Sequence, residues 1–181
     1  ANSSYTHSRA SVDGDLEHQE YLADASKDCQ RELTESLIAA LGEEGAIFVY
    51  SSFEKTRIKG LVKLYPDLAG ALNPIIERLV DLLIVIKEHV YHPQFKGSYS
   101  IKKVLPALVP DLSYEGLAIG DGNTAITMFA KMASGEVADT DQVRNDLLAY
   151  CELDTLAMVR LHDALLDCPD SKTFPTSPYQ Y

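Results

Sequence analysis

A tyrosine and an aspartate four residues apart, Tyr150 and Asp154, could contribute to a catalytic metal site. The segment 140–166 has the apolar periodicity of one long amphipathic helix, and Asp154 falls in the middle of its apolar face. An ionised carboxylate there is costly unless something pairs with it. A metal ion would do so, and the Tyr150 hydroxyl could orient the attacking water. The alternative is a core tyrosine hydrogen-bonded to a partly buried aspartate, which this short pattern alone favours.

A second carboxylate, Glu54, lies in the first turn of a predicted helix that follows a short apolar run, 46–50. Functional sites are often built at strand ends in α/β sheets, so Glu54 is a candidate metal ligand. Ser51 and Glu54 also have the S-x-x-E spacing of a capping box, in which both side chains satisfy backbone amides. Both interpretations stay open at this point.

A third carboxylate, Asp81, interrupts the apolar run 79–86. It is a candidate metal ligand or a residue that supports one. It could equally cap or break a helix, because a short acidic side chain can accept hydrogen bonds from nearby backbone amides. The sequence does not separate these two roles.

The segment 91–103 combines aromatic residues, a glycine and three lysines in a loop that leads into a helix. In a chain with a net charge of −11, it is the best local candidate for contacts with phosphates and bases. We expect substrate contacts from His92, Tyr99, Ser100 and Lys102. The alternative, slightly favoured by the sequence alone, is an ordinary loop whose lysines lie on a solvated helix face.

The order of the predicted elements indicates an α/β fold, with a small mixed sheet covered by helices. Strands at 5–12 and 16–22 would join through an Asp13-Gly14 turn. The run 46–50 has the pattern of a buried central strand. Residues 1–166 would form one domain, followed by a loosely held tail at 167–181. Helices are predicted at 28–41, 53–64, 73–80, 101–109, 123–132 and 140–166.

The composition fits one ordinary domain with a hydrophobic core, since 46% of the 181 residues are hydrophobic. No apolar run reaches membrane-spanning length, and no signal peptide is visible. The three cysteines show neither zinc nor disulfide spacing, so we expect a reducing cytoplasm. The negative charge argues against broad electrostatic capture of a phosphate backbone, but not against a nuclease whose acidic residues hold metals.

Longer strings of this sequence resemble the bacterial domain-of-unknown-function family 2779, which is similar to the ribonuclease-H-like 3′→5′ exonucleases of the DEDD class. The resemblance extends over about 16–166. It implies a ribonuclease-H-like α/β fold, with a mixed sheet flanked by helices. The strings that carry the resemblance are 16–24, 48–58, 80–83, 91–93, 97–106, 121–122 and 150–154.

The resemblance also implies roles for single residues. In the tyrosine version of the DEDD class the third motif is Y-x-x-x-D on a C-terminal helix, and Tyr150 and Asp154 match it as water-positioning residue and metal ligand. The second motif has an Asn and, four residues on, an Asp, where this chain has Tyr50 and Glu54. The first motif, D-x-E on the opening strand, has no match. The segment 15–17 has its letters but falls at the expected hairpin turn, so we interpret it as a false match.

The implied function is metal-dependent hydrolysis of phosphodiester bonds in nucleic acid, DNA more than RNA, from the 3′ end. Two Mg²⁺ or Mn²⁺ ions would be held by Asp154, Glu54 and Asp81 together with the acids of the first motif. We expect the opening strand to precede residue 1, in a larger protein with an upstream nuclease-like region. The truncated chain alone is therefore expected to be inactive.

Two other functions stay open. One is a catalytically dead nuclease-fold domain that binds nucleic acid or protein, which the altered second motif and the acidic surface favour. The other is a helical interaction domain in which Asp154 pairs with a lysine or arginine. Binding of Mg²⁺ or Mn²⁺ would distinguish a metal site from the helical interaction domain, which predicts none.

Overall fold

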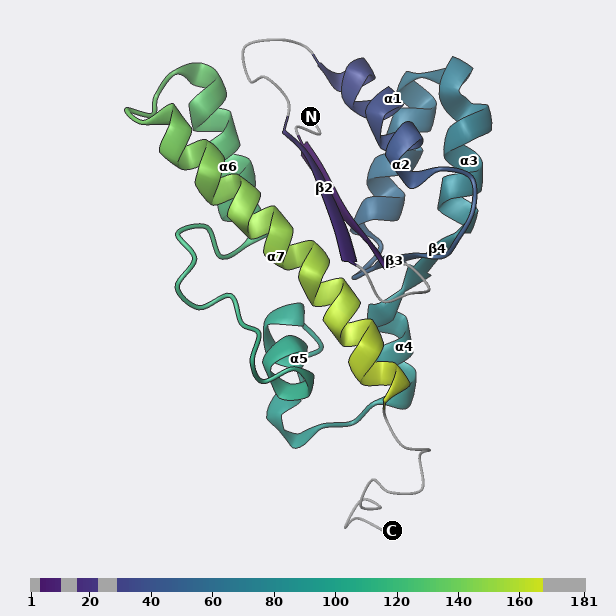
Figure 1. The fold of residues 1–181 in the computed structure, drawn as a ribbon, viewed down its shortest axis with the longest axis vertical. Helices are drawn as coiled ribbons and strands as arrows, with labels where there is room; N and C mark the ends of the chain where they lie inside the picture. Colours follow the sequence, from purple (N-terminus) through teal and green to yellow (C-terminus); the bar gives the residue numbers. More distant parts are fainter. Residues whose placement is uncertain (1–3, 11–15, 23–28, 168–181) are drawn as a thin grey trace.

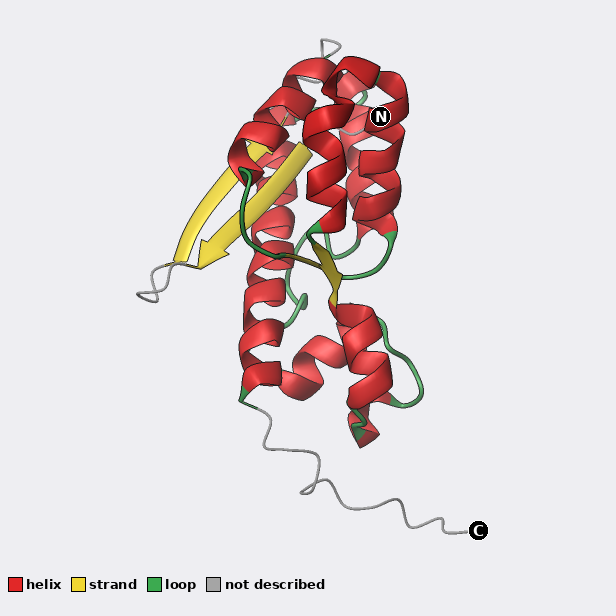
Figure 2. Cartoon of the chain, turned by 90° about the vertical axis from the view of Figure 1, so that its right-hand side faces the viewer, coloured by secondary structure: helices red, strands yellow, loops and turns green. Residues whose placement is uncertain are grey.

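The structure, a computed structural model, describes residues 4–10, 16–22 and 29–167. The described chain is mostly helical, with a few short strands (Figures 1 and 2). The strands are β1 (Ser4–Ala10), β2 (Leu16–Leu22), β3 (Ile47–Val49) and β4 (Leu79–Asp81). The α-helices are α1 (Gln30–Leu41), α2 (Phe53–Leu64), α3 (Ala69–Glu77), α4 (Leu82–His89), α5 (Ile101–Leu108), α6 (Gly122–Ser134) and α7 (Thr140–Leu166). Two short 3-10 helices are η1 (Pro66–Leu68) and η2 (Pro93–Phe95).

The four described strands form two separate two-stranded sheets. β1 and β2 pair antiparallel along their whole length. β3 and β4 pair in parallel, and Val49 at the end of β3 lies opposite Asp81 at the end of β4. Within the described part of the chain, β3 is therefore paired on one edge only, and its predicted central position in a sheet is not observed.

Most predicted elements are confirmed, including the helices 53–64 and 140–166 with their bounds. The predicted helix over 73–80 is confirmed over 73–77 but its bounds are wrong, because α3 begins at Ala69 and ends at Glu77, and residues 79–81 form β4. An apolar run of this length does not distinguish a buried strand from a helix, and here pairing with β3 decides. The predicted Asp13-Gly14 turn and residues 168–181 of the predicted tail lie outside the described residues.

Buried apolar side chains gather in three clusters. The α2–α3 core lies between those two helices and contains Ile58, Leu61, Leu72 and Ile75. The α6–α7 core joins these helices to the end of β2 and contains Leu22, Ile119, Met132, Val143 and Leu147. The α4–α5–α7 core contains Leu82, Ile86, Val90, Phe95, Val104, Leu105, Ala157 and Leu161.

Helix α7 contributes to two of these cores, one near each of its ends. It begins at Asp139, whose carboxylate accepts a hydrogen bond from the Gln142 amide at 2.9 Å, as expected of an N-cap residue. The β1–β2 hairpin lies along α7, while α1, α2 and α3 form a separate group beside it (Figure 1). The segment 150–154 lies in the middle of α7, between the two cores.

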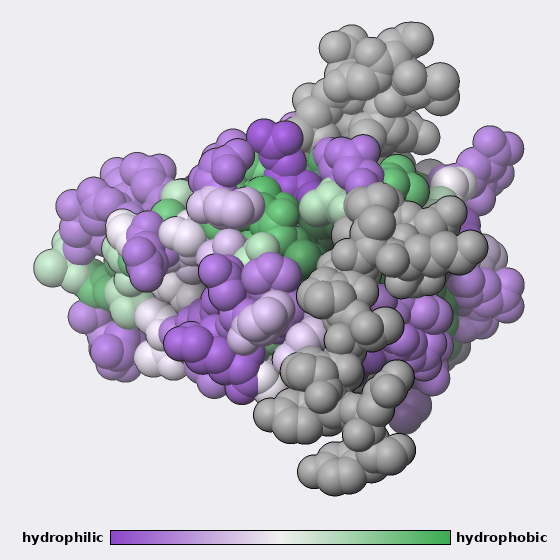
Figure 3. All heavy atoms as spheres, turned by 90° about the horizontal axis from the view of Figure 1, so that it is seen from below, coloured by the Kyte–Doolittle hydropathy of each residue, from purple (hydrophilic) through white to green (hydrophobic). Residues whose placement is uncertain are grey.

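The surface at the end of the molecule where α4, α5 and the last turns of α7 lie is mainly polar. Figure 3 shows that end, with a small apolar area surrounded by hydrophilic groups. None of the described helices is long and apolar enough to cross a membrane.

Candidate functional site

The carboxyl ends of β3 and β4 lie side by side and place two acidic residues near each other. After β3 the chain passes through Tyr50, Ser51 and Ser52 into α2, and after β4 it enters α4 directly. Ser51 has a φ of 98°, a left-handed conformation that is rare for residues other than glycine. Its amide donates a hydrogen bond of 2.9 Å to Oδ1 of Asp81, which holds this unusual turn against the end of β4.

Asp81 is the N-cap of α4. The same Oδ1 accepts a hydrogen bond of 3.0 Å from the Leu83 amide, so one oxygen joins the turn after β3 to the first turn of α4. The predicted capping role is confirmed, and a role of Asp81 in metal binding stays a prediction. The capping box predicted from Ser51 and Glu54 does not form, because Ser52 is the N-cap of α2 and makes no side-chain cap hydrogen bond.

Glu54 lies in the first turn of α2 and is largely buried. Burial raises the pKa of its carboxyl group, and the nearby charges of Asp154 and Asp81 raise it further, while a backbone hydrogen bond opposes them. Its Oε2 atom is buried and has no hydrogen-bond partner among the described residues. The charge of Asp154 thus reaches Glu54, although the two residues lie on different helices.

Asp154 is held by two phenols. The Tyr114 hydroxyl donates a hydrogen bond of 2.7 Å to its Oδ1, and the Tyr150 hydroxyl also hydrogen-bonds to this carboxylate. Burial raises the pKa of Asp154, and the two phenols and the Lys102 charge partly offset this effect. The i,i+4 spacing thus correctly predicted that Tyr150 lies beside Asp154, and the metal role of Asp154 stays a prediction.

Tyr114 is a site residue that the sequence did not indicate. It lies in the irregular segment between α5 and α6, and its ring lies 6.2 Å from that of Tyr150, measured between centroids. Burial raises the pKa of both phenols, so both hydroxyls stay protonated and act as hydrogen-bond donors to Asp154. An isolated tyrosine in a segment without periodicity carries no signal of this contact.

Tyr50, which the resemblance described above aligns with the Asn of the second DEDD motif, makes a contact with the segment before α5. Its hydroxyl donates a hydrogen bond of 2.6 Å to the backbone carbonyl of Tyr99. Burial and the Asp81 charge raise the pKa of Tyr50. The hydrogen bond ties the end of β3 to the segment that leads into α5.

The four predicted substrate-binding residues separate into three places. Tyr99 and Ser100 line an open hollow beside the end of β3. Lys102 extends toward Asp121, with 4.0 Å between Nζ and Oδ2. His92 is the N-cap of η2, and its Nδ1 accepts a hydrogen bond of 3.3 Å from the Gln94 amide.

The ion pair predicted between Asp154 and a basic residue is not observed among the described residues, although a lysine acts on Asp154 from a distance. The hydrogen-bond donors on the Asp154 carboxylate are phenols, and Lys102 acts on it through its charge. The Lys102 ammonium forms its ion pair with Asp121. The Asp121 carboxylate also caps α6 by accepting hydrogen bonds from the amides of Asn123 and Thr124. The Asp154 side chain is therefore satisfied mainly by neutral donors.

Within the described residues, no group of three or more His, Cys, Asp or Glu side chains is arranged to hold a metal ion. If Glu54 and Asp154 bind a metal ion, further ligands are needed to complete its coordination. Of the D-x-E letters at 15–17, Leu16 and Glu17 lie at the start of β2, and Asp15 lies outside the described residues.

Comparisons with known proteins connect this chain to uncharacterised relatives. It is 30% identical to the uncharacterized protein UU173 of Ureaplasma parvum serovar 3, over 65% of this chain and 20% of that protein. The chain thus spans about a fifth of the length of this relative. No solved structure matches. The family model described as "Domain of unknown function (DUF2779)" matches residues 3–100, which is more than half of the chain, and the chain therefore belongs to this family.

Proposed function

We propose that this chain supplies part of a metal-dependent site that hydrolyses phosphodiester bonds in nucleic acid, in the manner of a 3′→5′ exonuclease. The observation that carries the proposal is the pair Glu54 and Asp154. These two largely buried carboxyl groups have raised pKa values, and the charge of Asp154 contributes to the raised pKa of Glu54 near the carboxyl ends of β3 and β4. Perturbed acids of this kind gather at functional sites more often than elsewhere.

The carboxylate oxygens of Glu54 and Asp154 are suitable ligands for a divalent cation, although they supply only part of a coordination shell. Mg²⁺ and Mn²⁺ prefer carboxylate oxygens, and Oε2 of Glu54 is a buried oxygen to which no group in the described part of the chain donates a hydrogen bond. A cation between Glu54 and Asp154 would offset the desolvation that raises both pKa values. The remaining ligands would come from elsewhere in a longer protein, which agrees with the small share of the relative that this chain spans.

In this proposal each residue has a defined task. Asp154 and Glu54 hold the metal, which would polarise the phosphate and activate a water molecule. Tyr150 orients that water, and Tyr114 fixes the Asp154 carboxylate. Asp81 orders the turn between β3 and α2, and its Oδ2 atom faces no described hydrogen-bond donor that would prevent metal binding.

A ribonuclease-H-like sheet is part of the same proposal. Such a sheet would be continuous, whereas β1–β2 and β3–β4 are separate in the described residues. In this proposal an additional strand that carries the D-x-E motif pairs with the edge of β3 that has no partner in the described residues, and it brings two further carboxylates to the strand ends. DNA is the preferred substrate in this proposal, with RNA as the alternative.

The test uses a protein that carries this domain with its native flanking sequence. Hydrolysis of 3′-labelled single-stranded DNA is measured with Mn²⁺ and with a chelator. Asp154→Asn and Glu54→Gln should each lower the rate by about 100-fold or more, because several kcal/mol of transition-state stabilisation are lost. Glu152→Gln is the matched control, since Glu152 lies on the exposed face of the same helix and should have little effect.

The proposal is wrong if the two site variants cleave at the rate of the control, or if the chelator leaves the rate unchanged. Calorimetric titration with Mn²⁺ gives a second readout that does not need catalysis. Binding should be weakened in Asp154→Asn and Glu54→Gln and retained in Glu152→Gln.

A second candidate is a nuclease-fold domain that binds nucleic acid without cleaving it. The use of the Tyr50 hydroxyl to hold the Tyr99 carbonyl favours this candidate, because the Asn expected at that position is replaced by a structural contact. Retained DNA binding with no hydrolysis in any metal would support it.

A further inference from the structure

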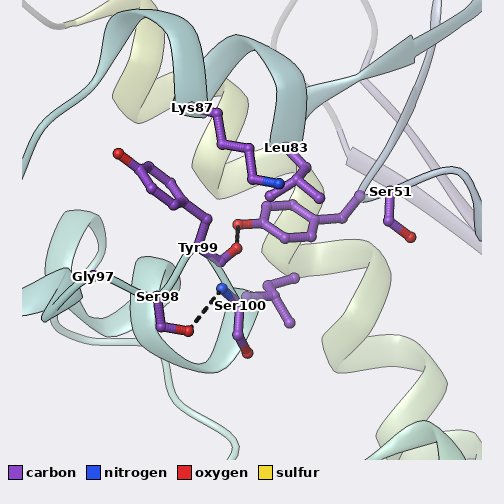
Figure 4. A pocket seen from close by; sticks show the side chains of 9 residues that line it. Ser51, Leu83, Lys87, Gly97, Ser98, Tyr99 and Ser100 are labelled. Carbon is purple, nitrogen blue, oxygen red and sulfur yellow. Dashed lines mark hydrogen bonds between the residues drawn. The ribbon is translucent and has the colours of Figure 1, made fainter.

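An open hollow of about 550 Å³ lies between α4, the turn after β3 and the segment that leads into α5 (Figure 4). It is separate from the Glu54–Asp154 pair, because neither of these residues lines it. Its position beside the carboxyl end of β3 is typical of ligand sites in α/β folds. The lining residues are Tyr50, Ser51, Leu83, Lys87, Gly97, Ser98, Tyr99, Ser100 and Ile101.

The charge of the hollow is opposite to that of the whole chain. Its lining contains one lysine, Lys87, and no carboxylate, although the chain carries a net charge of −11. The ammonium of Lys87 makes no hydrogen bond or ion pair with any other described residue, and the side chain extends over the hollow in Figure 4. A lysine in these surroundings selects an anion, and phosphate is the common anion that an ammonium binds as a point charge.

Hydroxyl groups on the opposite wall could complete the contacts to a phosphate. Ser98 and Ser100 contribute two of them, and Oγ of Ser98 accepts a hydrogen bond of 3.4 Å from the Ser100 amide (Figure 4). Ser98 can therefore still donate its own proton to a ligand. Ser51 lines the hollow from the turn that Asp81 holds in its left-handed conformation, but its hydroxyl points away from Ser98 and Ser100 (Figure 4).

An aromatic side chain lies beside these polar groups. Tyr99 is half-buried, and its ring and that of Phe95 form an edge-to-face contact with 5.7 Å between centroids. Its backbone is fixed because the Tyr50 hydroxyl holds the Tyr99 carbonyl at 2.6 Å. An ordered and partly exposed tyrosine next to a phosphate-binding group is the arrangement on which unpaired bases stack.

We propose that this hollow binds one nucleotide of a single-stranded nucleic acid, with its phosphate on Lys87, Ser98 and Ser100 and its base against Tyr99. Lys87 is a binding residue that sequence reasoning did not identify, and Lys102 lies elsewhere. The choice of nucleic acid as the ligand rests on the proposed function, whereas the binding itself needs no metal and no hydrolysis.

The test measures binding of fluorescein-labelled ten-residue oligothymidylate to the chain by fluorescence anisotropy, with a chelator present throughout. Wild type should bind. Lys87→Gln should weaken binding by about tenfold, since a hydrogen bond to a charged group is lost. Lys59→Gln is the control for net charge, because Lys59 is an exposed residue of α2 outside the hollow, and it should change affinity less than twofold.

Tyr99 is tested in the same assay. Tyr99→Leu should weaken binding by about tenfold and Tyr99→Phe by less than twofold, because stacking needs the ring and not the hydroxyl. Inorganic phosphate should compete only at far higher concentration than the oligonucleotide. The inference is overturned if Lys87→Gln and Lys59→Gln weaken binding equally, if Tyr99→Leu has no effect, or if phosphate competes as well as oligothymidylate.

These outcomes are independent of the proposed hydrolysis. If Asp154→Asn abolishes cleavage while Lys87→Gln leaves binding unchanged, the nuclease proposal survives and the hollow is not its substrate site. If Lys87→Gln weakens binding while no metal-dependent cleavage is found, the hollow stands as a site of the binding module.

Discussion

Replacing Asp81 by alanine should destabilise the fold, because two backbone amides lose the carboxylate oxygen to which both donate a hydrogen bond. Oδ1 of Asp81 accepts hydrogen bonds from the Ser51 amide at 2.9 Å and from the Leu83 amide at 3.0 Å. The first bond orders the turn that leads from β3 into α2, and the second caps α4. Both amides are partly buried, so water replaces the carboxylate only in part.

The size of the effect follows from the two bonds. Loss of an aspartate N-cap costs about 1 kcal/mol. Loss of a hydrogen bond from a partly buried amide to a charged acceptor adds about 1.5 kcal/mol. We therefore expect Asp81→Ala to lower the free energy of unfolding by about 2–3 kcal/mol. For a chain of this size this corresponds to a fall in melting temperature of about 4–12 °C.

Urea denaturation followed by circular dichroism at 222 nm measures this change, with thermal unfolding as a second readout. Asp81→Asn is the informative partner, because its amide oxygen can accept the same two hydrogen bonds, and it should cost less than about 1 kcal/mol. The reasoning is refuted if Asp81→Ala changes the free energy of unfolding by less than about 0.5 kcal/mol. In the Mn²⁺ titration described above, loss of binding in the stable Asn variant would reveal an additional role of Asp81 as a ligand.

Two further predictions concern the buried acids. Tyr114→Phe should lower the free energy of unfolding by about 1–2 kcal/mol, because Asp154 loses the donor at 2.7 Å, and denaturation should show no such loss for the exposed control Tyr91→Phe. The second concerns pH: because the folded-state pKa of Glu54 is raised above 4.5, its contribution to stability is fully present below that pH and is lost as the pH rises through the folded pKa. With a chelator present, Glu54→Gln should therefore be more stable than wild type near pH 7, and its stability should decline less steeply above pH 4.5. Equal pH slopes in the two proteins would show that Glu54 does not titrate abnormally.

The sequence predicts the elements of this fold best where periodicity is long or a residue marks a boundary. The pattern of 140–166 continues over many turns, and its predicted bounds match α7. β4 could not be predicted in the same way, because three residues carry no period and their conformation depends on pairing with β3, about thirty positions earlier. The apolar residues before and after β4 continue its hydrophobic pattern, so the sequence predicted a helix there.

In the candidate site, too, local contacts could be predicted from the sequence and tertiary contacts could not. Tyr150 and Asp154 lie on one helix, so their proximity follows from helical geometry alone. Tyr114 reaches Asp154 from an irregular segment forty positions earlier, and Lys87 reaches the hollow from α4. Contacts of this kind are set by tertiary packing, which a local pattern does not encode. Asp81 shows an intermediate case, since its capping role was one of two local interpretations and only the fold selected it.

The length of α7 has a mechanical consequence for the residues at its centre. At 1.5 Å per residue, its 27 residues extend over about 40 Å. The helix is anchored near one end in the α6–α7 core and near the other in the α4–α5–α7 core, and Tyr150 to Asp154 lie between the two anchors. Two separately packed cores therefore meet at these residues. A partner or ligand that loosens either core would change the tilt of the helix. This tilt would change the hydrogen-bond geometry between the phenols and the Asp154 carboxylate at the middle of the helix.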